Sequence, residues 1–183
     1  MAGRRPWGWH ALEPGWAEDL VDAASLPPGA LVLDVGAGTG AITGPLVSRG
    51  ARVIAVEAHP ERAAALRARF GRSIVVVEAD AADLRLPRRP YYVVANPPFG
   101  VTAPLLRRLL QPGSRLARAH LVLQESAARR WAHPGAPGAG RWRLQFAATA
   151  GPRLPRAAFR PPPRVDVRVL TIERLGGPGR TGR

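Results

Sequence analysis

The sequence has no cysteine among its 183 residues, which excludes disulfide bonds, thiolate catalysis and zinc sites built on sulfur. It also has no apolar run that approaches the ~20 residues a membrane-spanning helix requires. Residues 1–9 are basic and aromatic and lack the apolar stretch of a secretory signal. We therefore expect a cytoplasmic protein without a metal site, and we take a monomer as the default state.

Lysine is missing as well, so the formal net charge of +14 is carried entirely by arginine. A genome rich in G and C would favour arginine codons, and this compositional explanation accounts for arginine in place of lysine. It does not account for 27 basic residues against 13 acidic ones. A polyanionic partner does, because unpaired guanidinium groups bind phosphate and release its counterions. We therefore expect a nucleic acid as the partner.

Apolar runs alternate with stretches that have the period of an amphipathic helix, as in a parallel sheet covered by helices. The apolar runs predict strands at 31–35, 53–56, 74–77, 91–95, 119–123 and 165–172. The periodic stretches predict helices at 16–24, 42–49, 60–70, 102–110 and 125–131. Runs that are apolar throughout fit strands covered on both faces, so the pattern predicts an α/β fold.

Two segments lack this periodicity. Residues 133–143 are rich in Gly, Pro and Arg, which predicts a long mobile loop. Residues 175–183 carry two arginines and no apolar pattern. We therefore expect a single domain over residues 1–174, followed by a disordered basic tail.

A glycine-rich loop, LDVGAGTGA at residues 33–41, follows the first of these strands and precedes a helix. Glycines in such a loop let the backbone turn sharply and approach a ligand closely. Gly36, Gly38 and Ala41 also satisfy the relaxed dinucleotide pattern G-x-G-x-x-G/A. The loop therefore predicts a nucleotide-type cofactor, with S-adenosylmethionine (AdoMet) and NAD both open, and a purely structural turn as a third interpretation.

Carboxylates follow the next two predicted strands, at the edge where the ligand crevice of an α/β sheet opens. Glu57 could accept hydrogen bonds from both hydroxyl groups of a ribose. Asp80 and Asp83 are alternatives for accepting a hydrogen bond from an adenine amino group. We favour Asp80, with Ala81 beside it, because it is closer to the strand end.

The tetrapeptide Asn96-Pro97-Pro98-Phe99 follows the run at 91–95 and indicates a specific chemistry. The exocyclic amine of adenine is a poor nucleophile because its lone pair is delocalised into the ring. The Asn96 side-chain oxygen and the Pro97 carbonyl could each accept one N–H, which favours a pyramidal nitrogen that attacks a methyl group and then loses a proton to water. Phe99 could stack on the base. A Pro-Pro turn that merely ends a strand remains the structural alternative.

The segment FRPPPRV at residues 159–165 precedes the last predicted strand. Together with N-P-P-F, this F-x-P-x-P-x-V arrangement resembles the rRNA adenine N6-methyltransferase superfamily, which includes the erythromycin-resistance (Erm) methylases and the KsgA-type dimethylases. The resemblance covers roughly residues 4–173. It implies a Rossmann-like class I AdoMet-dependent methyltransferase fold, with a mostly parallel seven-stranded sheet and helices on both faces. It also implies that Phe159 faces Phe99 across a flipped adenine, although a role as a hydrophobic anchor remains open.

The same resemblance implies AdoMet as the cofactor and S-adenosylhomocysteine as its product. The glycine loop, Glu57, Asp80 and Asn96 match the family's cofactor segments. His10 and Leu12 are expected beside the methionine part of AdoMet.

The sequence departs from the family pattern in three places. Trp9 stands where the family usually has Gln, and Pro97 stands where it generally has Ile or Leu. The family's C-terminal helical domain is expected to be absent, so RNA would be held by the catalytic domain alone. The candidate RNA-binding residues are Arg4, Arg5, Arg107, Arg108, Arg129, Arg130, Arg141, Arg143, Arg160 and Arg164.

Several functions remain open within and beyond this resemblance. We favour the Erm-like branch, which methylates 23S rRNA and confers resistance to macrolides, because a lysine-free, arginine-rich chain fits a high-G+C bacterium that protects its own ribosomes. A KsgA-type enzyme acting on 16S rRNA and a DNA adenine methylase are the catalytic alternatives. A non-catalytic RNA-binding module and an NAD-dependent reductase are the alternatives from other classes.

Overall fold

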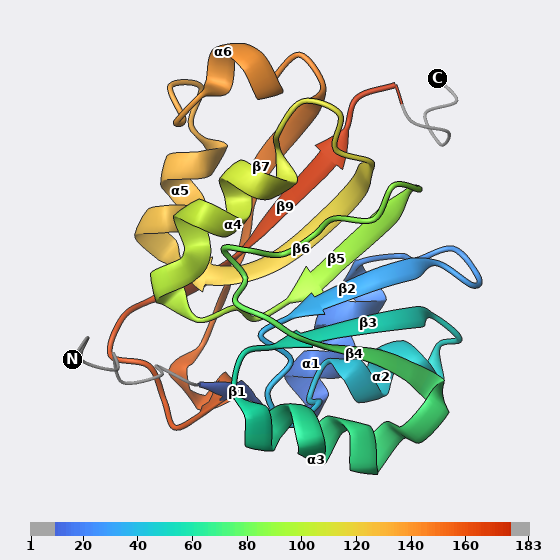
Figure 1. The fold of residues 1–183 in the computed structure, drawn as a ribbon. Coiled ribbons are helices and arrows are strands. Elements are labelled where there is room, and N and C mark those ends of the chain that lie inside the picture. Colours follow the sequence, from blue (N-terminus) through green and yellow to red (C-terminus); the bar gives the residue numbers. More distant parts are fainter. Residues whose placement is uncertain (1–9, 177–183) are drawn as a thin grey trace, which may run out of the picture.

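The computed structural model describes residues 10–176, which form an α/β structure around one large sheet (Figure 1). Seven strands lie in the order β4-β3-β2-β5-β6-β9-β7. Their bounds are β2 (Leu31–Val35), β3 (Arg52–Glu57), β4 (Ile74–Glu78), β5 (Tyr91–Ala95), β6 (Leu116–Gln124), β7 (Phe146–Leu154) and β9 (Val167–Arg174). Neighbours from β4 to β6 are parallel, whereas β9 is antiparallel to both β6 and β7. This arrangement confirms the expected mostly parallel, seven-stranded Rossmann-like sheet.

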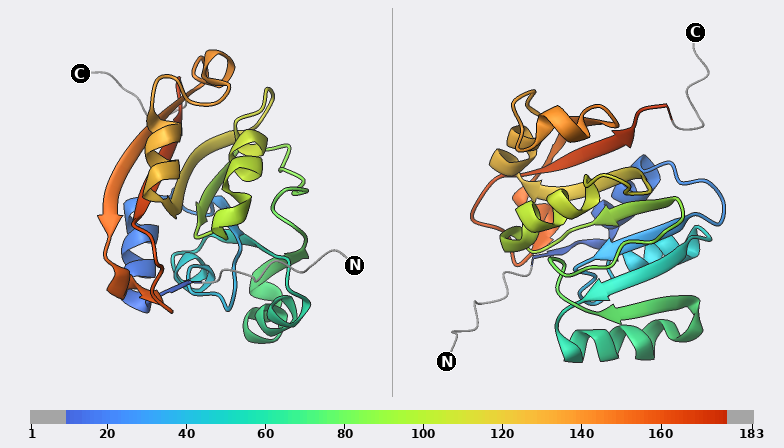
Figure 2. Two further views of the ribbon diagram at one scale, coloured as in Figure 1. Left: turned by 90° about the vertical axis from the view of Figure 1, so that its left-hand side faces the viewer. Right: turned by 45° about the horizontal axis from the view of Figure 1, so that its top comes forward.

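Helices cover both faces of the sheet (Figures 1 and 2). One buried cluster includes apolar residues of α1 (Pro14–Ala23), α2 (Thr43–Ser48) and α3 (Pro60–Phe70). The other includes apolar residues of α4 (Thr102–Leu109), α5 (Glu125–Ala132) and α6 (Ala139–Trp142). Strand β2 contributes to both clusters, Val32 to the first and Leu33 to the second, because successive side chains of a strand point to opposite faces.

The segment 133–143, expected to be a long mobile loop, instead contains the short helix α6. Its aromatic residue explains the difference. Trp142 is buried, its ring centroid lies 6.4 Å from that of Trp131 in α5, and its Nε1 donates to the carbonyl of Pro137 at 3.0 Å. One buried tryptophan thus fixes a stretch whose Gly and Pro content indicates a loop.

A second, two-stranded sheet lies beside the carboxyl ends of the parallel strands (Figure 1). Strand β1 (Ala11–Leu12) pairs antiparallel with β8 (Phe159–Arg160), and Leu12 lies opposite Phe159. Short 3-10 turns complete the fold at Gly71–Ser73, Phe99–Val101 and Arg156–Ala158. The pairing brings residues from both ends of the described chain to the edge of the sheet where the glycine loop and the tetrapeptide lie.

Several residues named from the sequence lie outside the described range of 10–176. Arg4, Arg5 and Trp9 precede the described residues, and most of the expected tail, 177–183, follows them. At the end of the described part, the backbone N–H of Leu175 donates to the carbonyl of Gln145 at 2.8 Å. Over residues 10–176, none of the helices has the length and apolar character to cross a membrane.

Candidate active site

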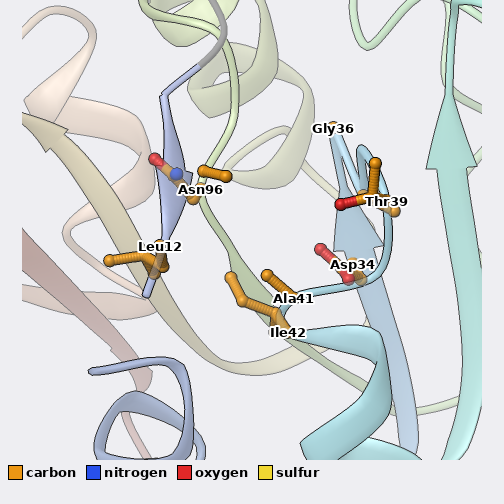
Figure 3. Close-up of a pocket in the computed structure, with 9 residues that line it drawn as sticks. Leu12, Asp34, Gly36, Thr39, Ala41, Ile42 and Asn96 are labelled. Atoms are coloured by element: carbon orange, nitrogen blue, oxygen red, sulfur yellow. The ribbon is translucent and has the colours of Figure 1, made fainter. Parts of the chain in front are cut away.

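A pocket that is open to solvent lies between the glycine loop, β1 and the end of β5 (Figure 3). In Figure 3, Asn96 and Leu12 lie on one side of the cavity, and Asp34 and Thr39 lie across from them. The lining residues are Ala11, Leu12, Asp34, Gly36, Ala37, Thr39, Ala41, Ile42 and Asn96. Three predicted site residues, Leu12, Gly36 and Asn96, therefore line a single cavity.

The lining also includes a carboxylate that we did not single out from the sequence. Asp34 is buried; its Oδ2 accepts a hydrogen bond from Thr43 Oγ1 at 2.6 Å, while its Oδ1 is buried without a partner among the described residues. Burial raises the pKa of Asp34 to about 7, partly offset by the Thr43 hydrogen bond, and the nearby charge of Glu57 adds to the rise. A lone acidic residue within the otherwise apolar strand Leu31–Val35 is the sequence signal for this position.

The tetrapeptide is held in place by His10. Asn96 Nδ2 donates to the His10 carbonyl at 2.6 Å, which leaves Oδ1 as the acceptor of that amide. The His10 ring stacks on Phe99, with centroids 5.8 Å apart, and Nδ1 of His10 lies 2.7 Å from the carbonyl oxygen of Pro161. His10 thus joins Asn96 and Phe99 to the proline-rich segment, and its expected place beside the cofactor stays a prediction.

Glu57 ends β3 next to the glycine loop, and its side chain is buried. Its Oε2 accepts from the backbone N–H of Gly38 at 2.8 Å, and its Oε1 accepts from that of His59 at 2.9 Å. Each carboxylate oxygen can accept more than one hydrogen bond, so a ligand role is compatible with both contacts. The structure therefore places Glu57 beside Gly38 of the glycine loop.

Asp80 lies beyond the end of β4 and is exposed, whereas Ala81 beside it is buried. The Asp80 Oδ1 accepts from the backbone N–H of Ala82 at 2.8 Å, a local turn contact. Arg108 of α4 donates from Nη2 to the carbonyl of Ala82 at 2.9 Å. The loop that carries Asp80 is therefore tied to the helix that follows the tetrapeptide.

Phe159 is 1% exposed and packs in the buried cluster that includes Leu12. Phe99 lies against the same cluster and is partly buried. The ring that stacks on Phe99 in this conformation is that of His10. The burial of Phe159 is compatible with the anchor interpretation, and its place opposite Phe99 across a flipped base stays a prediction.

The predicted RNA-binding arginines fall into two groups. Arg108 and Arg143 are partly buried; Arg108 bonds to Ala82, and Arg143 Nη2 donates to the carbonyl of Ala132 at 2.6 Å. These two have structural contacts that explain them without RNA. The exposed members within the described residues are Arg107, Arg129, Arg130, Arg141, Arg160 and Arg164, of which Arg129 pairs with Glu125 and Arg160 with Glu13.

Comparison with known proteins identifies the family. The family model described as ribosomal RNA adenine dimethylase matches residues 13–178. The chain belongs to this family. An rRNA adenine N-6-methyltransferase of Corynebacterium diphtheriae is 37% identical over 163 residues, which cover 87% of this chain and 62% of that protein. A ribosomal RNA small subunit methyltransferase A of Synechococcus is 37% identical over 185 residues, covering 92% of this chain and 66% of that protein.

A solved structure supports the same relationship. The crystal structure of the 23S rRNA methyltransferase ErmE matches with a TM-score of 0.77 and 27% identity, covering 90% of this chain and 69% of that one. The chain spans just under two thirds of the length of the two curated relatives, 62% and 66%. No group of His, Cys, Asp or Glu side chains within residues 10–176 is arranged to hold a metal ion.

Proposed function

We propose that this chain is an AdoMet-dependent methyltransferase that modifies the exocyclic amine of an adenine in ribosomal RNA. The observation that carries the proposal is the position of Asn96, which lines the same cavity as the glycine loop with its amide oriented by His10. Because Asn96 Nδ2 donates to the His10 carbonyl, Asn96 Oδ1 is the atom that would accept an N–H from a substrate.

The cavity residues fit AdoMet. Gly36 and Ala37 present backbone and small side chains, and Asp34 adds a buried carboxyl oxygen that lacks a hydrogen-bond partner among the described residues. Glu57 and Asp80 would hold the ribose and the adenine of the cofactor. When bound, AdoMet would supply an electrophilic methyl group, and its positive charge would favour the ionised form of Asp34.

The chain's own residues would bind and orient the target amine. Asn96 Oδ1 and the Pro97 carbonyl would accept its two N–H groups, and the fixed φ of the prolines keeps that carbonyl in place. Phe99 would stack on the base, which is worth ~1–3 kcal/mol. These hydrogen bonds strengthen as the nitrogen gains positive charge, so the contribution to catalysis is positioning and electrostatic stabilisation.

Transfer of tritium from labelled AdoMet tests the proposal. We expect label in ribosomal RNA and none in duplex DNA, and titration calorimetry should show binding of AdoMet and not of NAD. Label in DNA would identify a DNA adenine methylase instead. Binding of NAD without AdoMet would overturn the methyltransferase assignment altogether.

We further propose 23S rRNA as the substrate, with protection against macrolides as the consequence. The structural similarity to the 23S methyltransferase ErmE supports this choice, and the similarity to small-subunit methyltransferases makes 16S rRNA the second candidate. Methylation would remove a hydrogen-bond donor and add bulk where a drug docks. Mass spectrometry of both rRNAs from cells that express the chain decides between them, since modified 16S rRNA alone would contradict the 23S assignment.

A further inference from the structure

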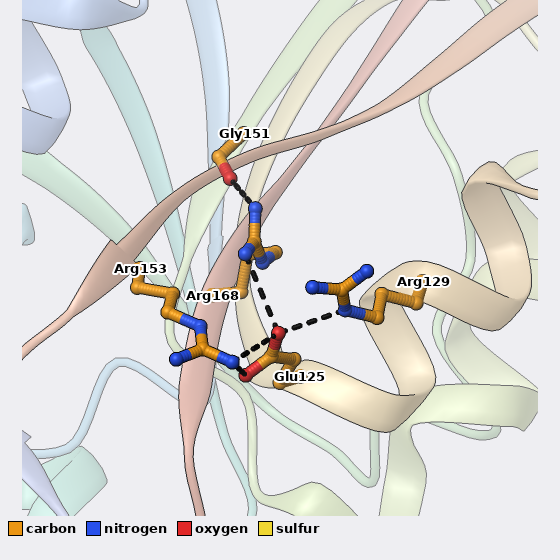
Figure 4. A network of polar contacts seen from close by, with 5 residues as sticks. All are labelled: Glu125, Arg129, Gly151, Arg153 and Arg168. Atoms are coloured by element: carbon orange, nitrogen blue, oxygen red, sulfur yellow. Dashed lines mark hydrogen bonds and ion pairs between the residues drawn. The ribbon is translucent and has the colours of Figure 1, made fainter.

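Three arginines converge on one buried carboxylate at the start of α5 (Figure 4). Glu125 accepts from Arg129 Nε at 2.8 Å, from Arg153 Nη2 at 2.8 Å and from Arg168 Nη2 at 3.3 Å. Hydrogen bonds from Arg129 and Arg153 hold the pKa of Glu125 at about 2, well below its ordinary value. Glu125 is therefore ionised at neutral pH and fixes the position of the guanidinium groups around it.

The three arginines differ in exposure. The Arg168 side chain is 17% exposed and also donates to the Gly151 carbonyl, so it belongs to the scaffold. The Arg129 and Arg153 side chains are 62% and 59% exposed. Each guanidinium has five N–H groups, so both retain donors that Glu125 does not use.

The charges in this cluster do not balance. Glu125 and the exposed Asp166, whose charge acts on Arg153, face three arginines. One positive charge is left over, and Arg130, the exposed neighbour of Arg129, adds another. An excess of positive charge is not needed for a purely structural ion pair. It is expected where a site binds an anion.

The cluster lies at the same edge of the sheet as the tetrapeptide. Arg153 is near the end of β7 and Arg168 near the start of β9, where Val167 pairs with Gln124, the residue before Glu125. Strand β6 neighbours β5, which leads into Asn96. Strands β9 and β7 follow β6 in the sheet, so with neighbouring strands about 4.8 Å apart the backbones of Arg168 and Arg153 lie roughly 10–15 Å from the end of β5.

We propose that Arg129 and Arg153, positioned by Glu125, form a binding site for a backbone phosphate of the RNA strand that carries the target adenine. This inference rests on the proposed function and extends it by naming residues of the catalytic domain that bind the RNA backbone. A planar guanidinium group can donate two parallel hydrogen bonds to two oxygens of one phosphate.

The test is the salt dependence of RNA binding in Arg129→Gln and Arg153→Gln, which remove the charge but keep a side-chain donor near Glu125. The probe is an in vitro transcribed 23S rRNA fragment, with 16S rRNA in parallel. We expect the dissociation constant at low salt to rise about tenfold in each variant. The slope of log affinity against log salt should become shallower by about 0.7 for each phosphate that the variant no longer binds.

Arg115→Gln is the matched control, because Arg115 is exposed and precedes β6 at the opposite end of that strand. The proposal fails if the Arg129 and Arg153 variants have the same slope as this control while melting at the wild-type temperature. Arg153→Lys restores the charge without the fork, and it should recover the slope; a slope equal to that of Arg153→Gln would also overturn the site. AdoMet affinity and methylation by the wild-type chain are measured alongside, since their loss would instead contradict the proposed function.

Discussion

A Cβ atom built on Gly36 would lie 2.8 Å from Cδ of Pro98 and 3.2 Å from Cα of Pro97. The glycine loop and the tetrapeptide therefore lie too close together at this point to leave room for a side chain on residue 36. The backbone φ of Gly36 is 76°, in the left-handed region that residues with a side chain rarely adopt. The cofactor loop and the proposed amine-binding turn consequently pack against each other, so a change in either should affect both.

Gly36→Ala should separate the two loops. We expect a loss of about 1–3 kcal/mol in unfolding free energy from the left-handed conformation and the contact with Pro98. AdoMet affinity and methyl transfer should fall together, measured by calorimetry and by tritium incorporation. Gly15→Ala in α1 is the matched control, because a Cβ there meets no atom within 4 Å, and it should leave both readouts unchanged.

Asn96→Ala should lower kcat by about 100-fold or more, because it removes an acceptor whose hydrogen bond strengthens in the transition state. AdoMet affinity should change only a few-fold, since the glycine loop remains. Single-turnover methylation and calorimetry measure the two effects. Gln111→Ala removes an exposed amide elsewhere and serves as the control. Turnover by Asn96→Ala close to the wild-type rate would remove Asn96 from the mechanism.

Much of the sheet could be predicted because its strands are apolar on both faces. The segments 31–35 and 91–95 coincide with β2 and β5, and the helix at 60–70 coincides with α3. Strand β7 is not among the predicted strands because Phe146–Leu154 consists largely of small residues and is interrupted by Gly151-Pro152, where its register with β9 shifts. An edge strand tolerates such a proline, and no hydrophobic pattern indicates it.

The candidate site could be predicted where its residues occupy one short motif, as in the glycine loop and the tetrapeptide. The contacts of His10 and Phe159 could not, because they depend on the pairing of β1 with β8, which lie far apart in the sequence. Glu125 could not be predicted for the same reason, since Arg153 and Arg168 lie 28 and 43 residues away and meet it only through the register of β6, β7 and β9.

The buried Asp34 should make stability depend on pH. Its pKa is about 7 in the folded state against an ordinary value of 3.8, so the folded chain binds the extra proton between these limits. The unfolding free energy due to this group should therefore fall as pH rises from about 4 to 7, by a few kcal/mol at most. Urea unfolding across this range, compared with Asp34→Asn, measures the effect.

The comparison with Asp34→Asn is needed because another group acts in the opposite direction. Burial lowers the pKa of His120 to about 4, so His120 makes the folded chain more stable as pH rises from about 4 to 6.5. Both proteins contain His120, and its contribution cancels in their difference. If the stability difference between them were constant across pH 4–7, Asp34 would not be protonated in the folded state at neutral pH.

Phe159→Ala should act mainly on stability. The side chain is 1% exposed, and truncation of a buried phenylalanine costs about 3 kcal/mol or more. Phe159→Leu keeps most of the apolar volume and should restore much of the unfolding free energy. If RNA methylation recovers with stability in Phe159→Leu, the residue is an anchor; if methylation stays low in a stable protein, the aromatic ring stacks on the base.

His10→Ala distinguishes the observed contacts of this residue from the cofactor role that the family resemblance implies. The substitution removes the ring that stacks on Phe99 and the hydrogen bond to the Pro161 carbonyl, but it keeps the backbone carbonyl that accepts from Asn96. We expect KM for RNA to rise about tenfold while the dissociation constant for AdoMet changes little. His10→Phe keeps the stacking and removes the hydrogen bond, so it should recover part of the RNA affinity. A large rise in the AdoMet dissociation constant, with RNA binding unchanged, would instead support the predicted role of His10 beside the cofactor.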